Sequence, residues 1–196
     1  MQFINTILAA ALGLTSVASA INTIQFVNQD STTRHIVFTS EADLGLAAMP
    51  DLVLEGMETK NQTFATGFIG NAYSYNDGAP NVPGMLAEVR FDGWDSLVFF
   101  DVSAIVNPDD TEGVKMIYPL GMDPTATSTP TSGCNSIGKC LNQYNAWNDI
   151  ATQTTKSSNL VCLLGNKATT ATRRAIKVRG NDVYPRDFVL GTEDSQ

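Results

Sequence analysis

The feature that most constrains this chain is a series of short β-prone runs, each ended by a cluster of turn-forming residues. The runs lie at residues 22–27, 34–39, 52–54, 63–69, 85–91, 97–102 and 114–118. The separators are rich in Gly, Pro, Asn and Asp, as in residues 76–84. In the first run, Ile24 and Phe26 alternate with polar side chains, which is the period of a half-buried strand. Short strands at this spacing predict a mostly β fold, either a β-sandwich or a barrel.

Two later segments break this pattern. Residues 119–133 are rich in Pro, Thr, Ser and Gly, which predicts an irregular surface loop. Residues 140–152 carry Leu141, Tyr144 and Trp147 at three-residue spacing, which predicts a short helix with an apolar stripe.

The first 20 residues have the pattern of a cleavable signal peptide. An apolar run at residues 4–17 is followed by Ala18, Ser19 and Ala20, the small-x-small sequence that a signal peptidase accepts. The run is shorter than the roughly 18 to 20 residues that cross a bilayer. We therefore expect a secreted, extracellular protein that begins at Ile21 and does not insert into membranes.

The rest of the chain divides by charge. Residues 21–165 carry 6 Lys or Arg against 16 Asp or Glu, a net charge of −10, whereas residues 166–196 carry 6 against 4, or +2. We expect one monomeric β domain over 21–165 and a basic C-terminal extension over 166–196. The extension is either flexible, a tether to acidic polymers, or removed at the pair Arg173-Arg174. An acidic body repels phosphate backbones and anionic lipid, so nucleic acid is excluded as a partner and neutral polymers fit better.

The cysteines predict one disulfide bond. Cys134, Cys140 and Cys162 all lie late in the chain, and a secretory route oxidises thiols, but the spacing leaves the pairing open. His35 is the one histidine and there is no Cys-x-x-Cys spacing, so we expect no metal site. A phosphate-binding glycine loop is also missing, and we expect no cofactor. Asn61 begins the one N-glycosylation sequence, Asn-Gln-Thr.

The most specific motif lies at residues 84–103. It reads GMLAEVRF, then Trp94 in a turn, then LVFFDVS. This stretch resembles thaumatin-like proteins, in which a Leu-Ala-Glu-Phe strand turns into an Asp-Phe-Phe-Asp-Ile-Ser strand. Residues 24–28 and 67–73 are similar to other segments of that family, so the likeness covers roughly residues 22–118. It is greatest for short secreted fungal members, and it implies a thaumatin-like antiparallel β-sandwich with irregular loops.

The resemblance also implies a cleft. In the family an Arg, a Glu and several Asp residues line an acidic cleft that is associated with β-1,3-glucan binding and, in some members, weak glucan hydrolysis. Glu88 and Asp101 carry over to this sequence. Asn71 stands where the Arg is expected, and Val98 stands where the first Asp is expected. Half of the acidic set is therefore missing. This loss bears on hydrolysis, because cleaving a glycosidic bond needs two carboxyl groups.

Other residues complete the candidate cleft. Asp95 and Asp92 in the turn could supply a shifted acid or simply bend the backbone. Tyr73, with Tyr75 and Trp94, could stack on sugar rings.

Two functions remain. The favoured one is a secreted, non-catalytic protein of the cell wall or spore surface that binds β-1,3-glucan or a host surface protein, as fungal antigens, elicitors and effectors of this kind do. The alternative is a weak endo-β-1,3-glucanase that uses Glu88 as the acid and Asp101 or Asp95 as its partner.

Overall fold

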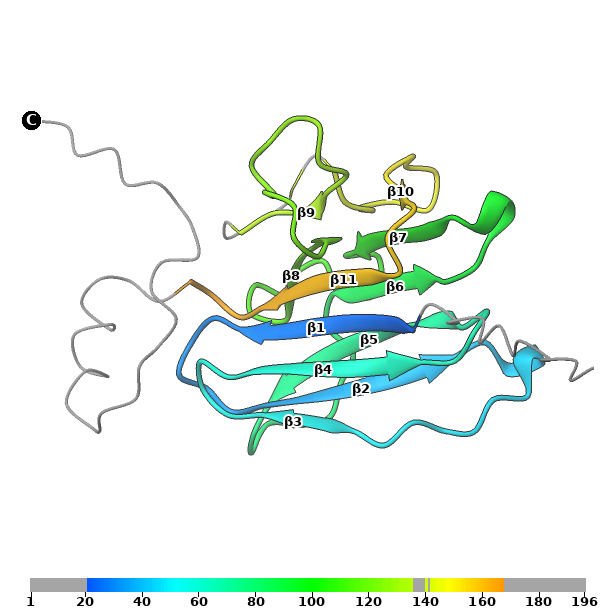
Figure 1. Cartoon of the computed structure of the whole chain (residues 1–196). Coiled ribbons are helices and arrows are strands. Elements are labelled where there is room, and N and C mark those ends of the chain that lie inside the picture. The colour runs from blue at the N-terminus through cyan, green and yellow to red at the C-terminus, as the bar shows by residue number, and fades with distance from the viewer. Residues whose placement is uncertain (1–20, 136–139, 141, 168–196) are drawn as a thin grey trace, which may run out of the picture.

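The computed structural model describes residues 21–135, 140 and 142–167, so the expected signal peptide and nearly all of the basic extension lie outside the described residues. The strands of the described part form two sheets (Figure 1). The five-stranded sheet has the order β4 (Thr59–Phe64), β1 (Asn22–Asn28), β11 (Asn159–Leu164), β8 (Val114–Pro119) and β9 (Ser132–Gly133). The six-stranded sheet has the order β10 (Gln153–Thr155), β7 (Val98–Ser103), β6 (Leu86–Arg90), β5 (Ile69–Asn76), β2 (Arg34–Ser40) and β3 (Leu52–Leu54). Two short 3-10 turns, η1 (Ala42–Leu44) and η2 (Trp94–Ser96), lie in connections.

The sheets pack face to face and confirm the predicted mostly β, sandwich-like fold. Strand alternation turns one side of each sheet inward, as β1 shows by burying Ile24 and Phe26 while Thr23 and Gln25 stay partly exposed. Aromatic side chains fill much of the space between the sheets. The ring centroids of Phe64 and Phe68 lie 4.8 Å apart. No helix of the described residues is long and apolar enough to cross a membrane.

One pair of strands departs from the antiparallel arrangement that the resemblance implied. β1 runs parallel to β11, with Ile24 opposite Leu160 and Phe26 opposite Cys162. β11 reaches this place from β10 in the other sheet and enters between β1 and β8, where it is antiparallel to β8. The first and last described strands thus become neighbours, which no local sequence signal encodes.

The run at residues 63–69 is not one strand. A turn divides it, because Gly67 takes a φ of +70° and the N–H of Phe68 donates to the carbonyl of Ala65 at 3.2 Å. Phe64 therefore ends β4 in one sheet while Ile69 begins β5 in the other. The left-handed glycine made the turn possible despite the continuous β-prone sequence.

The helix expected at residues 140–152 is absent from the described part of that segment. Tyr144 instead continues the edge of β7, since its N–H donates to Val102 at 2.9 Å and its carbonyl accepts from Ala104 at 2.8 Å. The Asp149 carboxylate then accepts from the N–H groups of Asn145 and Ala146, which fixes a tight turn. The predicted apolar stripe is not buried, because Trp147 is 86% exposed.

The structure shows which two cysteines form the disulfide bond, a pairing that the sequence left open. Cys134 and Cys140 are joined, with their Cα atoms 5.8 Å apart. Cys162 faces the core from β11 as a fully buried thiol, and burial raises its pKa because the thiolate would lose its hydration.

We therefore expect a thiol reagent such as Ellman's to label no cysteine in the folded protein at pH 8 and one cysteine per chain after unfolding without reductant. Cys162→Ala should abolish the remaining signal. Labelling of two or three thiols in the unfolded, unreduced chain would contradict the pairing of Cys134 with Cys140.

A buried ion pair joins the β1–β2 connection to the six-stranded sheet. Arg34 on β2 is 1% exposed, and its guanidinium donates to the Asp30 carboxylate at 2.7 Å. The same carboxylate accepts from the N–H of Asn166, just after β11. Asp30 thus neutralises an arginine that has almost no contact with water and also anchors the end of the described chain.

Asp30→Asn should lower the free energy of unfolding by about 3 kcal/mol, because removing one member of a buried pair leaves the other charge uncompensated. Asp77→Asn is the matched control. Asp77 pairs with His35 at 2.8 Å but is 69% exposed, so its loss should cost under about 1 kcal/mol. Urea denaturation checks both values, and equal losses would contradict the assignment.

Candidate functional site

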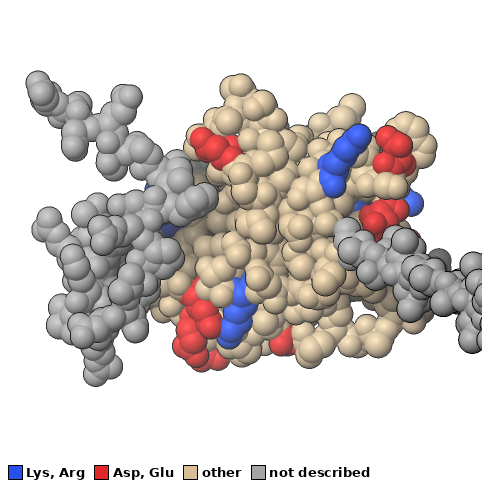
Figure 2. Space-filling model, viewed as in Figure 1, with Lys and Arg blue, Asp and Glu red and all other residues tan. Residues whose placement is uncertain are grey.

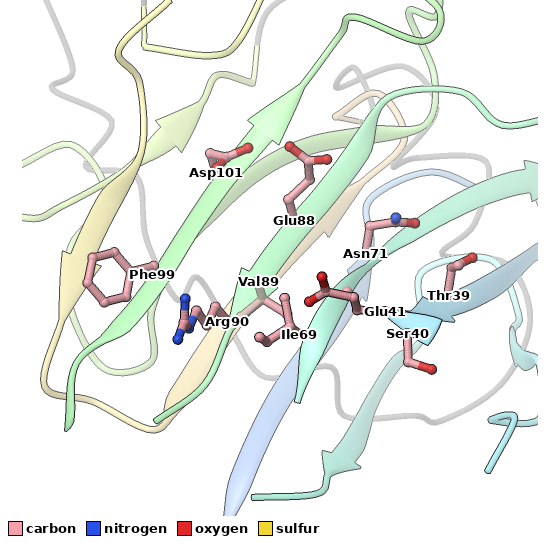
Figure 3. Close-up of a pocket in the computed structure, with 11 residues that line it drawn as sticks. Thr39, Ser40, Glu41, Ile69, Asn71, Glu88, Val89, Arg90, Phe99 and Asp101 are labelled. Atoms are coloured by element: carbon pink, nitrogen blue, oxygen red, sulfur yellow. The ribbon is translucent and has the colours of Figure 1, made fainter. Parts of the chain in front are cut away.

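A row of polar side chains crosses the outer face of the six-stranded sheet. Thr39 on β2 lies opposite Asn71 on β5, Asn71 lies opposite Glu88 on β6, and Glu88 lies opposite Asp101 on β7. Their sequence neighbours, such as Phe100, point into the core, so the row faces away from it. Figure 3 shows Glu88 and Asp101 side by side on adjacent strands, with Asn71 next to Glu88.

This row lines a pocket of about 410 Å³. A second cross-strand row supplies the rest of the floor, with Ile69 opposite Arg90 and Arg90 opposite Phe99. Glu41, which follows β2, also lines the pocket (Figure 3). The pocket therefore combines hydrogen-bonding groups with an aromatic ring and one cation, within the size range of small-ligand sites.

Glu88 and Asp101 form a carboxyl pair that retains a proton. Asp101 is 8% exposed, hydrogen-bonds to Glu88, and accepts from the Thr152 hydroxyl at 3.5 Å. Burial, followed by the hydrogen bond and charge of Glu88, raises the pKa of Asp101 to about 8. At neutral pH the pair therefore holds one proton and can both donate and accept hydrogen bonds.

A short polar wall closes the Asp101 side of the pair. The hydroxyl of Thr152, just before β10, is 2.9 Å from the Tyr144 hydroxyl. Tyr144 is held by its backbone bonds to β7. The segment that was expected to be a helix thus contacts Asp101 through Thr152, and burial of Asp101 is the main cause of its raised pKa.

The remaining predicted residues are not part of the pocket. Asp95 is exposed in η2 with a φ of +58°, and Trp94 beside it is 80% exposed. Tyr73 lies two residues along β5 from Asn71, and its hydroxyl donates to Asn81 at 2.7 Å. Tyr75 stacks on His35 at 4.9 Å. The pocket therefore unites three predicted cleft residues, Asn71, Glu88 and Asp101, and leaves out Tyr73 and Asp95.

Two further positions have structural roles. The Asp92 carboxylate accepts from the Asn22 side chain at 2.8 Å and from the N–H of Gly67 at 2.9 Å, so it ties the β4–β5 turn to β1. Val98 is 3% exposed in the core, where a carboxylate would be desolvated.

Sequence reasoning missed several pocket residues. Thr39, Arg90, Phe99 and Thr152 belong to the site or its wall, but none stands out as a motif. Strand alternation from Glu88 and Asp101 marks Arg90 and Phe99 as facing the same side, which is a signal that the sequence did contain. Thr39 and Thr152 could be found only from the register of the sheet.

Among the residues that the structure describes, no group of three or more His, Cys, Asp or Glu side chains could hold a metal ion. The side chains that line the pocket offer hydrogen-bonding groups, one cation and one aromatic ring.

Asp101 should make the folded protein less stable as the pH rises. The folded chain keeps a proton that the unfolded chain releases near pH 3.8, so unfolding becomes easier between that pH and about 8, and levels off above it. Asp101→Asn should flatten this slope when urea denaturation is repeated from pH 4 to 9. Asp95→Asn, at an exposed position, should keep the wild-type slope, and an unchanged slope in Asp101→Asn would contradict the shared proton.

The described part of the chain is thus a small β-sandwich with a carboxyl pair on the outer face of one sheet. No family model matches the sequence. The chain is, however, 38% identical over 146 residues to the antigenic protein SchS21 of Stachybotrys chartarum, covering 74% of this chain and 96% of that protein. The chain belongs to the family of this fungal antigen.

The fold is also similar to a solved structure. The protein elicitor MoHrip2 from Magnaporthe oryzae superposes with a TM-score of 0.51 at 14% identity, over 74% of this chain and 98% of that one. This likeness is one of fold.

Proposed function

We propose that this chain is a secreted, non-catalytic fungal surface protein that binds β-1,3-glucan in the pocket of the six-stranded sheet. The observation that carries the proposal is the cross-strand row that brings Asn71, Glu88 and Asp101 together in one pocket beside Phe99. The family relation to an antigenic protein and the fold of an elicitor support a surface role.

The pocket suits a neutral sugar. Sugar hydroxyls both donate and accept hydrogen bonds, which the carboxyl pair and the Asn71 amide can match. Phe99 and Ile69 offer apolar surface for the faces of a sugar ring. A ligand with a negative charge would meet Glu41 and Glu88 at the same opening. An uncharged glucan therefore fits better than an acidic polymer.

The residues present argue against hydrolysis. Cleaving a glycosidic bond usually takes two carboxyl groups that flank the bond. Glu88 and Asp101 are neighbours within one cross-strand row, but Asn71 and Val98 stand where the resemblance implies an Arg and a further Asp, so half of the acidic set is missing. A pair of this kind is a binding element, and we keep the weak endo-β-1,3-glucanase only as the alternative to be tested.

The thaumatin-like resemblance is part of this proposal. Its two matching carboxyl residues, Glu88 and Asp101, are cross-strand partners here. The departures are also consistent with binding rather than catalysis, because Asn71 provides an uncharged amide and Val98 is a core residue.

A host surface protein is a second candidate partner, because one ordered turn displays large apolar side chains. Trp147 is 86% and Ile150 is 100% exposed, although Asp149 fixes the turn between them. Exposed aromatic and aliphatic anchors of this kind are typical of protein-binding surfaces.

The test is retention of the purified protein on insoluble β-1,3-glucan, with released reducing sugar assayed in parallel. We expect retention without sugar release. Phe99→Ala should weaken binding about tenfold, which corresponds to roughly 1.4 kcal/mol, because the ring no longer supports the sugar. Asn71→Ala should weaken it about fivefold through lost hydrogen bonds.

Gln25→Ala is the matched control, since Gln25 lies on the outer face of the other sheet and should bind like wild type. Sugar release that Glu88→Gln abolishes would establish the glucanase instead. If the protein shows neither retention nor sugar release, the turn that carries Trp147 and Ile150 becomes the favoured binding surface. Binding of wild type and of the variants Trp147→Ala and Ile150→Ala to host surface extracts would then be compared.

A further inference from the structure

Asn61 lies where a large group can be attached without disturbing the fold. It is an exposed residue in the middle of β4, which is an edge strand of the five-stranded sheet. Its side-chain oxygen Oδ1 accepts a hydrogen bond from the Gln25 side chain at 3.3 Å. Its side-chain nitrogen Nδ2 makes no hydrogen bond to another described residue. The nitrogen that N-glycosylation modifies is therefore open, and the oxygen that orients the side chain would stay bonded.

The second residue that the modification requires is equally accessible. Thr63 is two residues further along β4, so strand alternation places it on the same face as Asn61, and it is exposed. Gln62 between them faces the other way and is partly buried. The sequence Asn-Gln-Thr occurs once in the chain in this form, with no Pro at the middle position.

The surface around Asn61 can accommodate a neutral glycan. Asn61 lies opposite Gln25, Gln25 lies opposite Val161, and Val161 lies opposite Tyr118, so this row crosses the sheet without a charge. The row is accessible at its Asn61 end, whereas Val161 is only 4% exposed. Figure 2 shows that the charged residues in this view lie near the margin of the face, while its centre has none. β4 is also an edge strand, and unpaired edge strands are prone to pair with other chains, which a covering glycan would block.

We propose that Asn61 carries an N-linked glycan that covers the β4 edge and the outer face of the five-stranded sheet. This inference rests on the secretion included in the proposed function. In the secretory pathway the donor is a lipid-linked oligosaccharide pyrophosphate. Nδ2 of Asn61 forms the new bond to the anomeric carbon of the sugar, the bond from that carbon to the pyrophosphate breaks, Nδ2 loses one proton, and the lipid pyrophosphate leaves.

The glycan leaves the candidate ligand pocket open. Asn61 is on the outer face of one sheet, and Asn71, Glu88 and Asp101 are on the outer face of the other, with the core between them. Glycan and ligand would therefore occupy opposite sides of the sandwich and would not compete.

The experiment expresses the full chain in a filamentous fungus and compares the intact mass of the secreted protein before and after treatment with an N-glycosidase. We expect wild type to lose a mass equal to a whole number of hexose and N-acetylhexosamine units. Asn61→Gln and Thr63→Val should show no such loss. Thr63→Ser, which preserves the acceptor sequence, is the matched control and should behave as wild type does.

Two further measurements, of secretion and of retention on β-1,3-glucan, distinguish failure of this inference from failure of the proposed function. Secreted protein without a glycan would overturn the inference and leave secretion intact, whereas unglycosylated protein retained in the cell would contradict both. Removing the glycan from the folded protein should leave retention on β-1,3-glucan unchanged. A loss of retention larger than about threefold would overturn the placement of the glycan on the face opposite the pocket.

Discussion

The structure depends on the alternation of side chains along the strands of the six-stranded sheet. Ala72, Ala87 and Phe100 are held in the core, and their burial fixes the register of β5, β6 and β7. A shift of one residue would expose these apolar groups and bury the polar row instead. The same hydrophobic contacts that stabilise the sandwich therefore place Asn71, Glu88 and Asp101 side by side on its outer face.

The carboxyl pair shows how a binding site can oppose stability. Burial of Asp101 behind Thr152 and next to Glu88 costs free energy as the carboxyl loses its proton, so the core must compensate at neutral pH. A structural role alone would be served equally well by an uncharged pair. Under the proposed function, the proton on Asp101 would supply a donor to a ligand and Glu88 an acceptor.

The two outer faces of the sandwich differ in chemistry. The six-stranded sheet carries the polar pocket, with Arg90 and two glutamates around it. The five-stranded sheet presents an uncharged row that includes Gln25 and Tyr118 and ends at the open edge of β4. This division would allow one face to bind the proposed ligand while the proposed glycan covers the other, in a chain that belongs to the family of a fungal antigen.

The sequence by itself determined the mostly β class, because the period of two and the turn residues are local properties, and it singled out Glu88 and Asp101 through a motif. It did not determine the parallel pairing of β1 with β11, the turn that divides residues 63–69, or the irregular path of the expected helix. It also left open which cysteines pair, and it placed Tyr73 and Asp95 in a cleft that contains neither. These features depend on contacts between residues far apart in the chain. Only packing of the two sheets decides which strands become neighbours, and therefore which side chains share a pocket.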